Sequence, residues 1–544
     1  MRRLILSAAL AISIASPFAP AALTAADMPV PVPMAMPDDS AYVVAVVPDL
    51  LATLSRIEAI AALFAPGQMP PGSLKAQLGG MLGDAGLANF AGKPVIVVVG
   101  PGAPTPSFAL LVPAKDPQMY LDAGVNFGML LGKAVDGIAV LTQTPDGEIL
   151  GEKVAKNYAN LIKTLPKGDI RLLMAPDKLM QTYGGMLGMM VQMAAAQNPQ
   201  GPEVGKILGL QVAGLMAIAA DISAVQLDLN LDPVAIGEEL TISAKPGSDL
   251  AKVMAAPPAA VGQRAAARLG NEPSLMSMSG RINWAAYGVY AGDLLRKLKA
   301  KPEAQGLITD EVIAVAENVG AGLSGDTAFR MRTSEKSPLV WEGLYASADS
   351  AKAEASQESM ISLLTGKGAI GDLYRSMGVT MTMTKAARKS PSGVPVHAIG
   401  VTVDETKILP EQAAQMKMMS GYELAVTKGW VVMAQDPTSL DALIAGTGKG
   451  MSTSAEKAIG AGRNLYADLD IIGFVRAAMK MSGTGMDAMI PATKPGEPLS
   501  VASTCADGRA LVEIKWPLAP FVELMKAAQG GGAPQPKPDE NPAF

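Results

Sequence analysis

Hydrophobic positions along the chain follow two periods, one typical of strands and one typical of helices. Four segments start as a short apolar strand, pass through an Asp or Asn, and continue as an amphipathic helix. A side-chain oxygen at such a junction accepts a hydrogen bond from a free N–H of the first helical turn. We therefore interpret the four junction residues as helix N-caps, not as active-site carboxylates. They are Asp49, Asp177, Asn283 and Asp470.

Two Asp-Pro pairs also predict helix starts. In Asp116–Pro117 and Asp436–Pro437, the Asp can cap the helix while Pro occupies the first helical position, where its missing N–H costs nothing. The second pair belongs to a strand–break–helix segment that starts at Gly429, and a similar segment starts at Gly137.

Two further segments read as a hairpin followed by a helix. One runs from Ile222 to Ala256 and the other closes the chain. Their period-two alternation predicts strands with one buried face and one solvated face, which is typical of antiparallel sheets. The residues predicted to share a face are Val225, Leu227, Leu229 and Leu231 in the first hairpin, and Val512, Ile514 and Trp516 in the second.

The same order of segments occurs twice. Gly137 and Gly429 lie 292 residues apart, and Asp177 and Asp470 lie 293 apart. Equal offsets across separate segments indicate a tandem duplication. We predict an α+β protein with two tandem related domains, 39–257 and 272–528, each an antiparallel sheet with packed helices. An Ala/Pro-rich linker, 258–271, separates them, and the second domain has an insertion near 365–415.

The two ends of the chain predict export and disorder. Arg2 and Arg3, an apolar run and small residues up to Ala26 form the pattern of a signal peptide over 1–26. The apolar run is shorter than the roughly 20 residues of a membrane span. We therefore expect a periplasmic or extracellular protein. Residues 27–38 form a Pro-rich extended linker and 529–544 a disordered tail.

Composition narrows the classes of partner. The chain is 49% hydrophobic, 17% charged and carries a formal net charge of −5. It has no basic stripe, which argues against nucleic acid. The apolar excess indicates extensive burial or an apolar surface for a partner or lipid. The apolar stretch 207–220 is too short to span a membrane; we expect it to be buried, or to form an apolar hairpin with the helix before it.

These patterns resemble a family of uncharacterised exported bacterial proteins with a tandem strand–helix domain of unknown function. The resemblance is carried by the strand–Asp–helix segments, the hairpin–helix of Ile222–Ala256 and the segment Gly429–Gly446, and it covers most of the mature chain. It implies an extracytoplasmic location and assigns no activity.

The residues with reactive side chains are few. Cys505 is the only Cys and precedes an Asp507–Gly508 turn, so we predict a small core residue. His397 is the only His and shares a strand face with Ile399, so we predict a core or edge histidine. Ser454 opens an S-x-x-K motif that lacks its companion motifs.

Two glycine-rich segments fail the tests for phosphate binding. Gly366–Gly371 fits G-x-G-x-x-G but follows a helix-like segment, whereas the dinucleotide motif follows a strand. Gly446–Ser452 contains Gly-Lys without the first Gly of a P-loop. We therefore predict no cofactor.

Methionine is abundant, with 33 residues. Soft thioethers suit Cu(I), but unbranched Met also fills irregular cores and adaptable apolar surfaces, and we favour that interpretation. One His and one Cys exclude ordinary zinc and blue-copper sites. The clusters are Met186, Met189, Met190 and Met193 on one helix face, Met381 with Met383, and Met416 with Met418 and Met419.

The sequence therefore predicts a non-catalytic exported binding or scaffold protein of the envelope or medium, without catalytic, cofactor or metal residues. An envelope protein or an apolar ligand is the expected partner, and no transmembrane span or nucleic acid is expected. Two alternatives stay open. One is a carrier of an apolar ligand or lipid that uses the helices from Lys178 to Ala220, and the other is a serine-type hydrolase with an unrecognised site.

Overall fold

The computed structural model describes most of residues 30–530. The expected signal peptide and the tail from 531 lie outside the described residues. The internal ranges outside the description are 91–93, 103–104, 125–130, 164–167, 197–201, 256–263, 335–336, 338, 367, 377, 408–420, 449–452, 461–462, 483–489 and 491–496.

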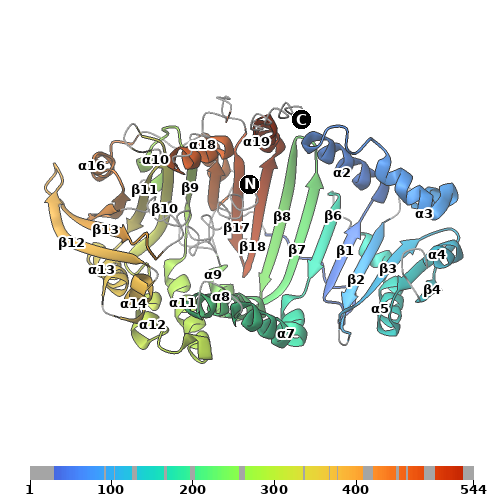
Figure 1. Ribbon diagram of the computed structural model, residues 1–544. Coiled ribbons are helices and arrows are strands. Elements are labelled where there is room, and N and C mark those ends of the chain that lie inside the picture. Colours follow the sequence, from blue (N-terminus) through green and yellow to red (C-terminus); the bar gives the residue numbers. More distant parts are fainter. Residues whose placement is uncertain are drawn as a thin grey trace, which may run out of the picture.

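The described strands form one 18-stranded sheet in which every pair is antiparallel. The sheet confirms the predicted α+β class with antiparallel pairing (Figure 1). From one edge to the middle, the neighbours are β4 (Leu131–Val135), β5 (Ile138–Thr142), β3 (Ser107–Pro113), β2 (Val95–Gly100), β1 (Val43–Val47), β6 (Ile170–Met174), β7 (Ile222–Leu231) and β8 (Ala235–Ala244).

From the middle to the other edge, the neighbours are β18 (Arg509–Pro517), β17 (Leu499–Ala506), β16 (Leu465–Leu469), β9 (Met276–Arg281), β10 (Leu323–Arg332), β11 (Val340–Ser347), β15 (Trp430–Ala434), β14 (Tyr422–Thr427), β13 (Pro395–Val403) and β12 (Val379–Lys389). The hairpin β12–β13 lies within the predicted insertion.

The sheet is continuous because β8 pairs with β18 along its full length, from Ala235↔Pro517 to Ser243↔Arg509. The sequence predicted one sheet for each half of the chain. Each half alone would leave one of these strands as an open edge, and pairing the two satisfies both rows of backbone N–H and C=O groups.

The two faces of the sheet differ in the middle. We call face A the side that carries Leu227, Leu240 and Val512, which are ladder neighbours on β7, β8 and β18. Face B is the opposite side, which carries Asp228, Glu239 and Glu513. Successive residues of a strand point to opposite faces, so face A is apolar and face B polar in these strands.

Helices pack on both faces. The described helices are α2 (Leu50–Phe64), α3 (Ser73–Phe90), α4 (Pro117–Gly124), α5 (Pro145–Lys156), α6 (Tyr158–Lys163), α7 (Pro176–Ala196), α8 (Pro202–Ala220), α9 (Asp249–Val253), α10 (Ala265–Leu269), α11 (Trp284–Lys299), η2 (Pro302–Ala304), α12 (Asp310–Glu317), α13 (Ser350–Thr365), α14 (Ala369–Ser376), α16 (Pro437–Ala445), α17 (Thr453–Gly460), α18 (Ile471–Ser482) and α19 (Leu518–Gly530). None of them is long and apolar enough to cross a membrane.

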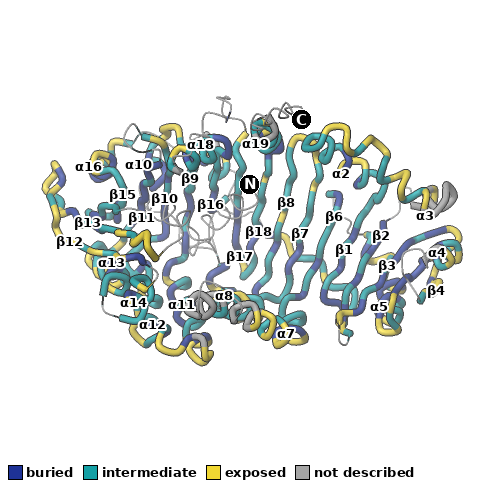
Figure 2. The backbone as a smooth tube through the Cα atoms, in the orientation of Figure 1, coloured by how far each residue is buried: buried dark blue, intermediate teal, exposed yellow. Residues whose placement is uncertain are grey.

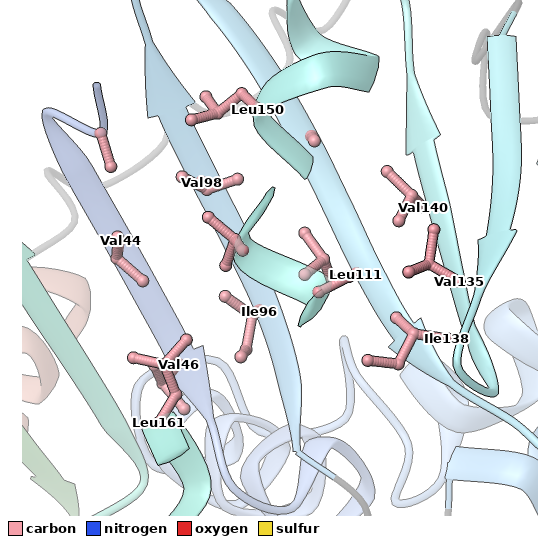
Figure 3. Packing of buried hydrophobic residues seen from close by; sticks show 14 of the residues in the cluster. Val44, Val46, Ile96, Val98, Leu111, Val135, Ile138, Val140, Leu150 and Leu161 are labelled. Carbon is pink, nitrogen blue, oxygen red and sulfur yellow. The ribbon is translucent and has the colours of Figure 1, made fainter. Parts of the chain in front are cut away.

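The outer strands bury their face B under helices. Leu150 of α5 and Leu161 of α6 pack on Val44, Ile96 and other residues of β1–β5 in the largest cluster (Figure 3). At the other end of the sheet, α10 and α16 pack on β10, β11, β14 and β15 in the same way. These clusters fix the two ends of the sheet.

Face A is covered by helices near the edges of the sheet and at one end of the central strands. Helices α2 and α4 pack over β2, β3 and β5, and α13 packs over β13–β15. Helices α9 and α11 cover one end of β8, β16, β17 and β18. In Figure 1, the middle of β6, β7, β8 and β18 is crossed by none of the described helices.

Segments expected to be linkers make specific contacts. Val30 is buried, and the Met34 N–H donates to Gln226 Oε1 on face B at 2.9 Å. Part of the second expected linker forms α10, and Ala265 at its start is buried in the core under α16. These contacts attach both segments to the sheet.

Candidate functional site

The central strands present a continuous apolar surface on face A. Ladder pairing places Leu172 beside Leu227, Leu227 beside Leu240, and Leu240 beside Val512, so one row crosses β6, β7, β8 and β18. The predicted sharing of a face is confirmed for both hairpins. The alternating residues from Val225 to Leu231 lie on face A beside β8. Val512, Ile514 and Trp516 of β18 lie on the same face, on the other side of β8.

The side chains of this surface are neither buried nor fully exposed. Figure 2 shows intermediate exposure along the middle of β7, β8 and β18, in contrast to the buried segments of β2 and β11. A covering helix layer would bury such side chains. None of the described helices crosses the middle of these strands (Figure 1), although at one end Phe521 of α19 packs on Trp516, with ring centroids 6.3 Å apart. We call these half-buried residues the apolar patch; they are Leu172, Leu227, Leu229, Leu231, Ile236, Leu240, Leu499, Val501, Val512, Ile514 and Trp516.

The apolar patch is wide enough to hold a lipid chain. It crosses five strands, and a strand spacing of about 4.8 Å gives a width of about 19 Å. One acyl chain fills half of a bilayer core of about 30 Å, so it is about 15 Å long. The strands are paired on both sides, so their backbone has no free N–H or C=O groups for a visiting peptide strand.

Face B of the same strands is polar, and two of its carboxylates are paired with arginines. Arg171 binds Asp228 through two hydrogen bonds, Nε to Oδ1 at 2.5 Å and Nη2 to Oδ2 at 2.9 Å. Arg463 Nη2 donates to Glu513 Oε1 at 2.6 Å. Burial raises the pKa of Glu513, the Arg463 charge lowers it, and the neighbouring Glu239 raises it again.

Three of the four predicted junction caps are confirmed. Asp49 accepts from the Ala52 N–H at 3.0 Å, Asn283 from Ala286 at 3.2 Å, and Asp470 from Gly473 at 3.0 Å. The Asp436 cap of α16 is confirmed as well, with Ser439 N–H at 2.9 Å. Asp116 directly precedes α4, and its carboxylate accepts a hydrogen bond from the Gln118 N–H at 3.1 Å.

The predicted cap at Asp177 is wrong. Helix α7 begins at Pro176, so Asp177 lies inside the first turn. Its Oδ2 lies 3.3 Å from Lys245 Nζ, and its Oδ1 accepts from the next backbone N–H at 2.8 Å. The fixed φ of Pro suits the first helical position, so the helix starts at Pro176, two residues before the Lys178 expected from a cap at Asp177.

The junction side chains lie at the starts of four different helices. Figure 1 places α2 and α18 along one end of the strands and α7 and α11 along the other. Among the described residues, no group of three or more His, Cys, Asp or Glu side chains is placed to hold a metal ion.

His397 lies in the core beneath α13. It is 6% exposed, pairs with Leu424 in the ladder, and shares face A with Ile399. Its Nε2 lies 3.4 Å from Glu354 Oε1, while its Nδ1 is buried without a partner. The core position predicted for His397 is therefore confirmed, although one of its ring nitrogens is unsatisfied.

Cys505 lies in the core cluster under α9 and α11, as predicted. Burial raises the pKa of its thiol well above the usual range, so the nucleophilic thiolate is scarce at neutral pH. The Cys505 N–H donates to Asn464 Oδ1 at 3.2 Å, which fixes the strand at this position.

The sequence motifs that resemble phosphate-binding or acyl-transfer sites do not lie in the structural setting that such sites require. Gly366–Gly371 joins helix α13 to helix α14, so no strand precedes it. Gly446 is the left-handed C-cap of α16, with φ 69°, and 449–452 lie outside the described residues. Ser454 belongs to α17, and its side chain also lies outside the description.

The methionine face of α7 points to solvent. Met186, Met189, Met190 and Met193 are between 41% and 61% exposed. The neighbouring α8 carries the exposed Leu215, and its described side chains, from 209 to 220, are half-buried or exposed. The expected burial of 207–220 is therefore confirmed only in part: Ile218, Leu210 and Ala213 pack against core clusters, whereas Leu215 is exposed. Met381 and Met383 pack against the core under α13, and Met416, Met418 and Met419 lie outside the described residues.

The fold and the site define an α+β protein built on one antiparallel sheet with an apolar central face. No family model, curated protein or solved structure matches the chain. The family resemblance drawn from the sequence patterns therefore stays a prediction.

Proposed function

We propose that this protein is a non-catalytic carrier that binds the hydrocarbon part of an apolar ligand or lipid on the apolar patch. The observation that carries the proposal is the half-buried state of Leu227, Leu240 and Val512 in the middle of the sheet. Exposed apolar side chains of this extent cost free energy in water and gain it when a hydrocarbon covers them.

A hydrocarbon chain fits this surface better than a peptide does. Recognition of an extended peptide draws on free backbone groups at a sheet edge, and the patch lies in the middle of the sheet, between paired strands. A hydrocarbon needs only contact area, which the rows from Leu172 to Val512 offer.

The expected export of the protein also supports the carrier proposal. The signal-peptide pattern of residues 1–26 indicates a periplasmic or extracellular protein, where an apolar molecule needs a carrier through water. In this proposal the ligand lies on the sheet, whereas the sequence pointed to the helices from Lys178 to Ala220.

A scaffold role is the second candidate, and the methionine face of α7 favours it. Met186, Met189, Met190 and Met193 form an uncharged, exposed helix face, and flexible Met side chains suit adaptable protein contacts. Crosslinking at this face in envelope extracts, with Met189→Glu as the variant that loses the partner, tests this candidate.

We also propose that the two halves of the chain arose by duplication. Outward from the β8–β18 pair, the strands run β7, β6, β1, β2, β3, β5, β4 on one side and β17, β16, β9, β10, β11, β15, β14 on the other. The equal succession supports related units over 39–257 and 272–528. The join between them continues the apolar patch from one half into the other.

The carrier proposal is tested by titration with decanol, a neutral ten-carbon alcohol, followed by calorimetry. Leu240→Lys places a charge in the patch and is expected to abolish binding. Glu239→Lys, the matched control, introduces the same side chain at the next residue but on face B, and is expected to retain binding.

Protein purified from its own host gives an independent measurement. Native mass spectra are expected to show a bound apolar molecule in the wild type and none in Leu240→Lys. Spectra of the wild type without a bound molecule, together with no decanol binding, would contradict the carrier function. Equal loss of decanol in both Lys variants would show that face A is not the binding surface.

A further inference from the structure

Face A carries a single charged side chain across the six central strands β6, β7, β8, β18, β17 and β16, and that side chain is Glu238. Leu229 and Ile514 are its ladder neighbours on either side. Ile236 and Leu240 flank it on the same face of β8, because side chains two residues apart in a strand share a face. The carboxylate is thus surrounded by the apolar patch.

Glu238 differs from the paired carboxylates of these strands, and from Glu239, which is exposed on face B. Asp228 on face B is paired with Arg171, and Glu513 with Arg463. Glu238 is half-buried and makes no hydrogen bond or ion pair with any described residue. A carboxylate among apolar side chains loses hydration without compensation, so a cation beside it restores the lost interaction.

We propose that Glu238 binds the cationic head group of an amphiphile whose hydrocarbon chain lies on the apolar patch. The inference rests on the proposed carrier function and adds the charge of the ligand to it. A protonated amine donates charge-assisted hydrogen bonds to the carboxylate, while the neighbouring Leu229, Leu240 and Ile514 contact the start of the chain. An anionic head group at the same place meets like-charge repulsion.

The experiment compares three probes of equal chain length: decylammonium, decanol and decanoate, each titrated below its aggregation concentration. The full-length wild type is expected to bind decylammonium most tightly and decanoate most weakly. Glu238→Gln is nearly isosteric and is expected to weaken decylammonium about tenfold, the loss of one charge-assisted hydrogen bond, while leaving decanol unchanged.

Two further variants separate the effect of the Glu238 charge from the effect of removing any carboxylate from this strand. Glu239→Gln removes the same charge one residue away on face B and is expected to bind all three probes like the wild type. Glu238→Leu completes the apolar row and is expected to bind decanol at least as tightly as the wild type, while losing the preference for decylammonium. Thermal melts confirm that each variant is folded.

The outcomes distinguish this inference from the function on which it rests. Binding of all three probes with equal affinity, or an equal loss of decylammonium in Glu238→Gln and Glu239→Gln, overturns the head-group site and leaves the carrier function intact. No binding of any probe overturns the carrier function itself.

Discussion

Glu239 and Glu513 face each other in the ladder that joins the two halves of the sheet. Both side chains lie on face B, and only Glu513 has a cationic partner, Arg463, at 2.6 Å. Directly opposed like charges destabilise a strand pair. The continuous sheet is therefore formed in spite of a repulsion at its join, which indicates that backbone pairing and the apolar side chains of face A outweigh it.

Replacing Glu239 by Lys is expected to stabilise the protein. The change converts a repulsion into an attraction across the β8–β18 pair and is expected to raise the free energy of unfolding by about 0.5 kcal/mol. Urea denaturation at pH 7 measures it, with Glu239→Gln expected to fall between the wild type and Glu239→Lys. A loss of stability in Glu239→Lys would show that the two carboxylates do not interact.

The same pair predicts a pH dependence. The pKa of Glu513 is raised in the folded protein, first by burial and also by Glu239, so the folded state binds this proton more tightly than the unfolded state does. Its contribution to stability is complete below the ordinary pKa of 4.5 and is lost as the pH rises through the folded value. Denaturation across this range is expected to show a smaller loss in Glu239→Lys than in the wild type.

Glu342 is expected to be among the most sensitive positions in the protein. It is 1% exposed and accepts from Arg330 Nε at 2.9 Å and from Arg332 Nε at 2.9 Å. Glu342→Gln leaves the buried Arg330 with only the exposed Glu272, 3.3 Å away, as an acidic partner, and is expected to lower the free energy of unfolding by about 3 kcal/mol. Chemical denaturation measures the change.

A double variant tests the cause of that loss. Arg330→Met with Glu342→Leu removes the buried charges together and is expected to recover most of the stability, since apolar residues can replace a buried ion pair. Glu152→Gln makes the same substitution in the solvent-facing pair with Lys133 and is expected to have a much smaller effect. A double variant as unstable as Glu342→Gln would contradict this explanation.

Asp49 is expected to contribute more to the free energy of unfolding than Asp177 does. Asp49→Ala removes a helix cap and is expected to cost about 1 kcal/mol, whereas Asp49→Asn retains an accepting oxygen and is expected to be nearly neutral. Asp177→Ala removes a partly exposed ion pair with Lys245 and a hydrogen bond from the adjacent Lys178 N–H, and is expected to cost less than Asp49→Ala. Thermal melts of the three variants rank them, and equal losses at both positions would contradict the difference in capping.

The methionine face of α7 is expected to oxidise first. Met186, Met189, Met190 and Met193 are exposed, whereas Met254 is 7% exposed in the core under α9. Mild peroxide treatment followed by peptide mapping is expected to give sulfoxide at the α7 positions well before Met254. Protection of the α7 positions in the purified protein would show that this helix is covered, and early oxidation of Met254 would show that the core under α9 is open to peroxide.

The local sequence pattern was sufficient to predict the features that depend only on residues nearby in the chain. The caps at Asp49, Asn283 and Asp470 follow from a polar side chain between a strand and a helix. The shared face of Val512, Ile514 and Trp516 follows from the period of two. Two local signals compete at Pro176–Asp177, and the predicted helix start is wrong there because the geometry of Pro prevails.

The sequence by itself determined which side chains of the central hairpins share a face and where the helices capped by Asp49, Asn283, Asp436 and Asp470 begin, because both depend on backbone geometry within a few residues. Only the tertiary structure decided that β8 pairs with β18, that the strands of both halves form one sheet, and that the apolar patch and the methionine face are left partly in water. The paired residues of β8 and β18 lie between 266 and 282 positions apart, from Ser243↔Arg509 to Ala235↔Pro517. Such pairing and the presence of a covering layer depend on segments far apart in the chain, and no local period encodes them.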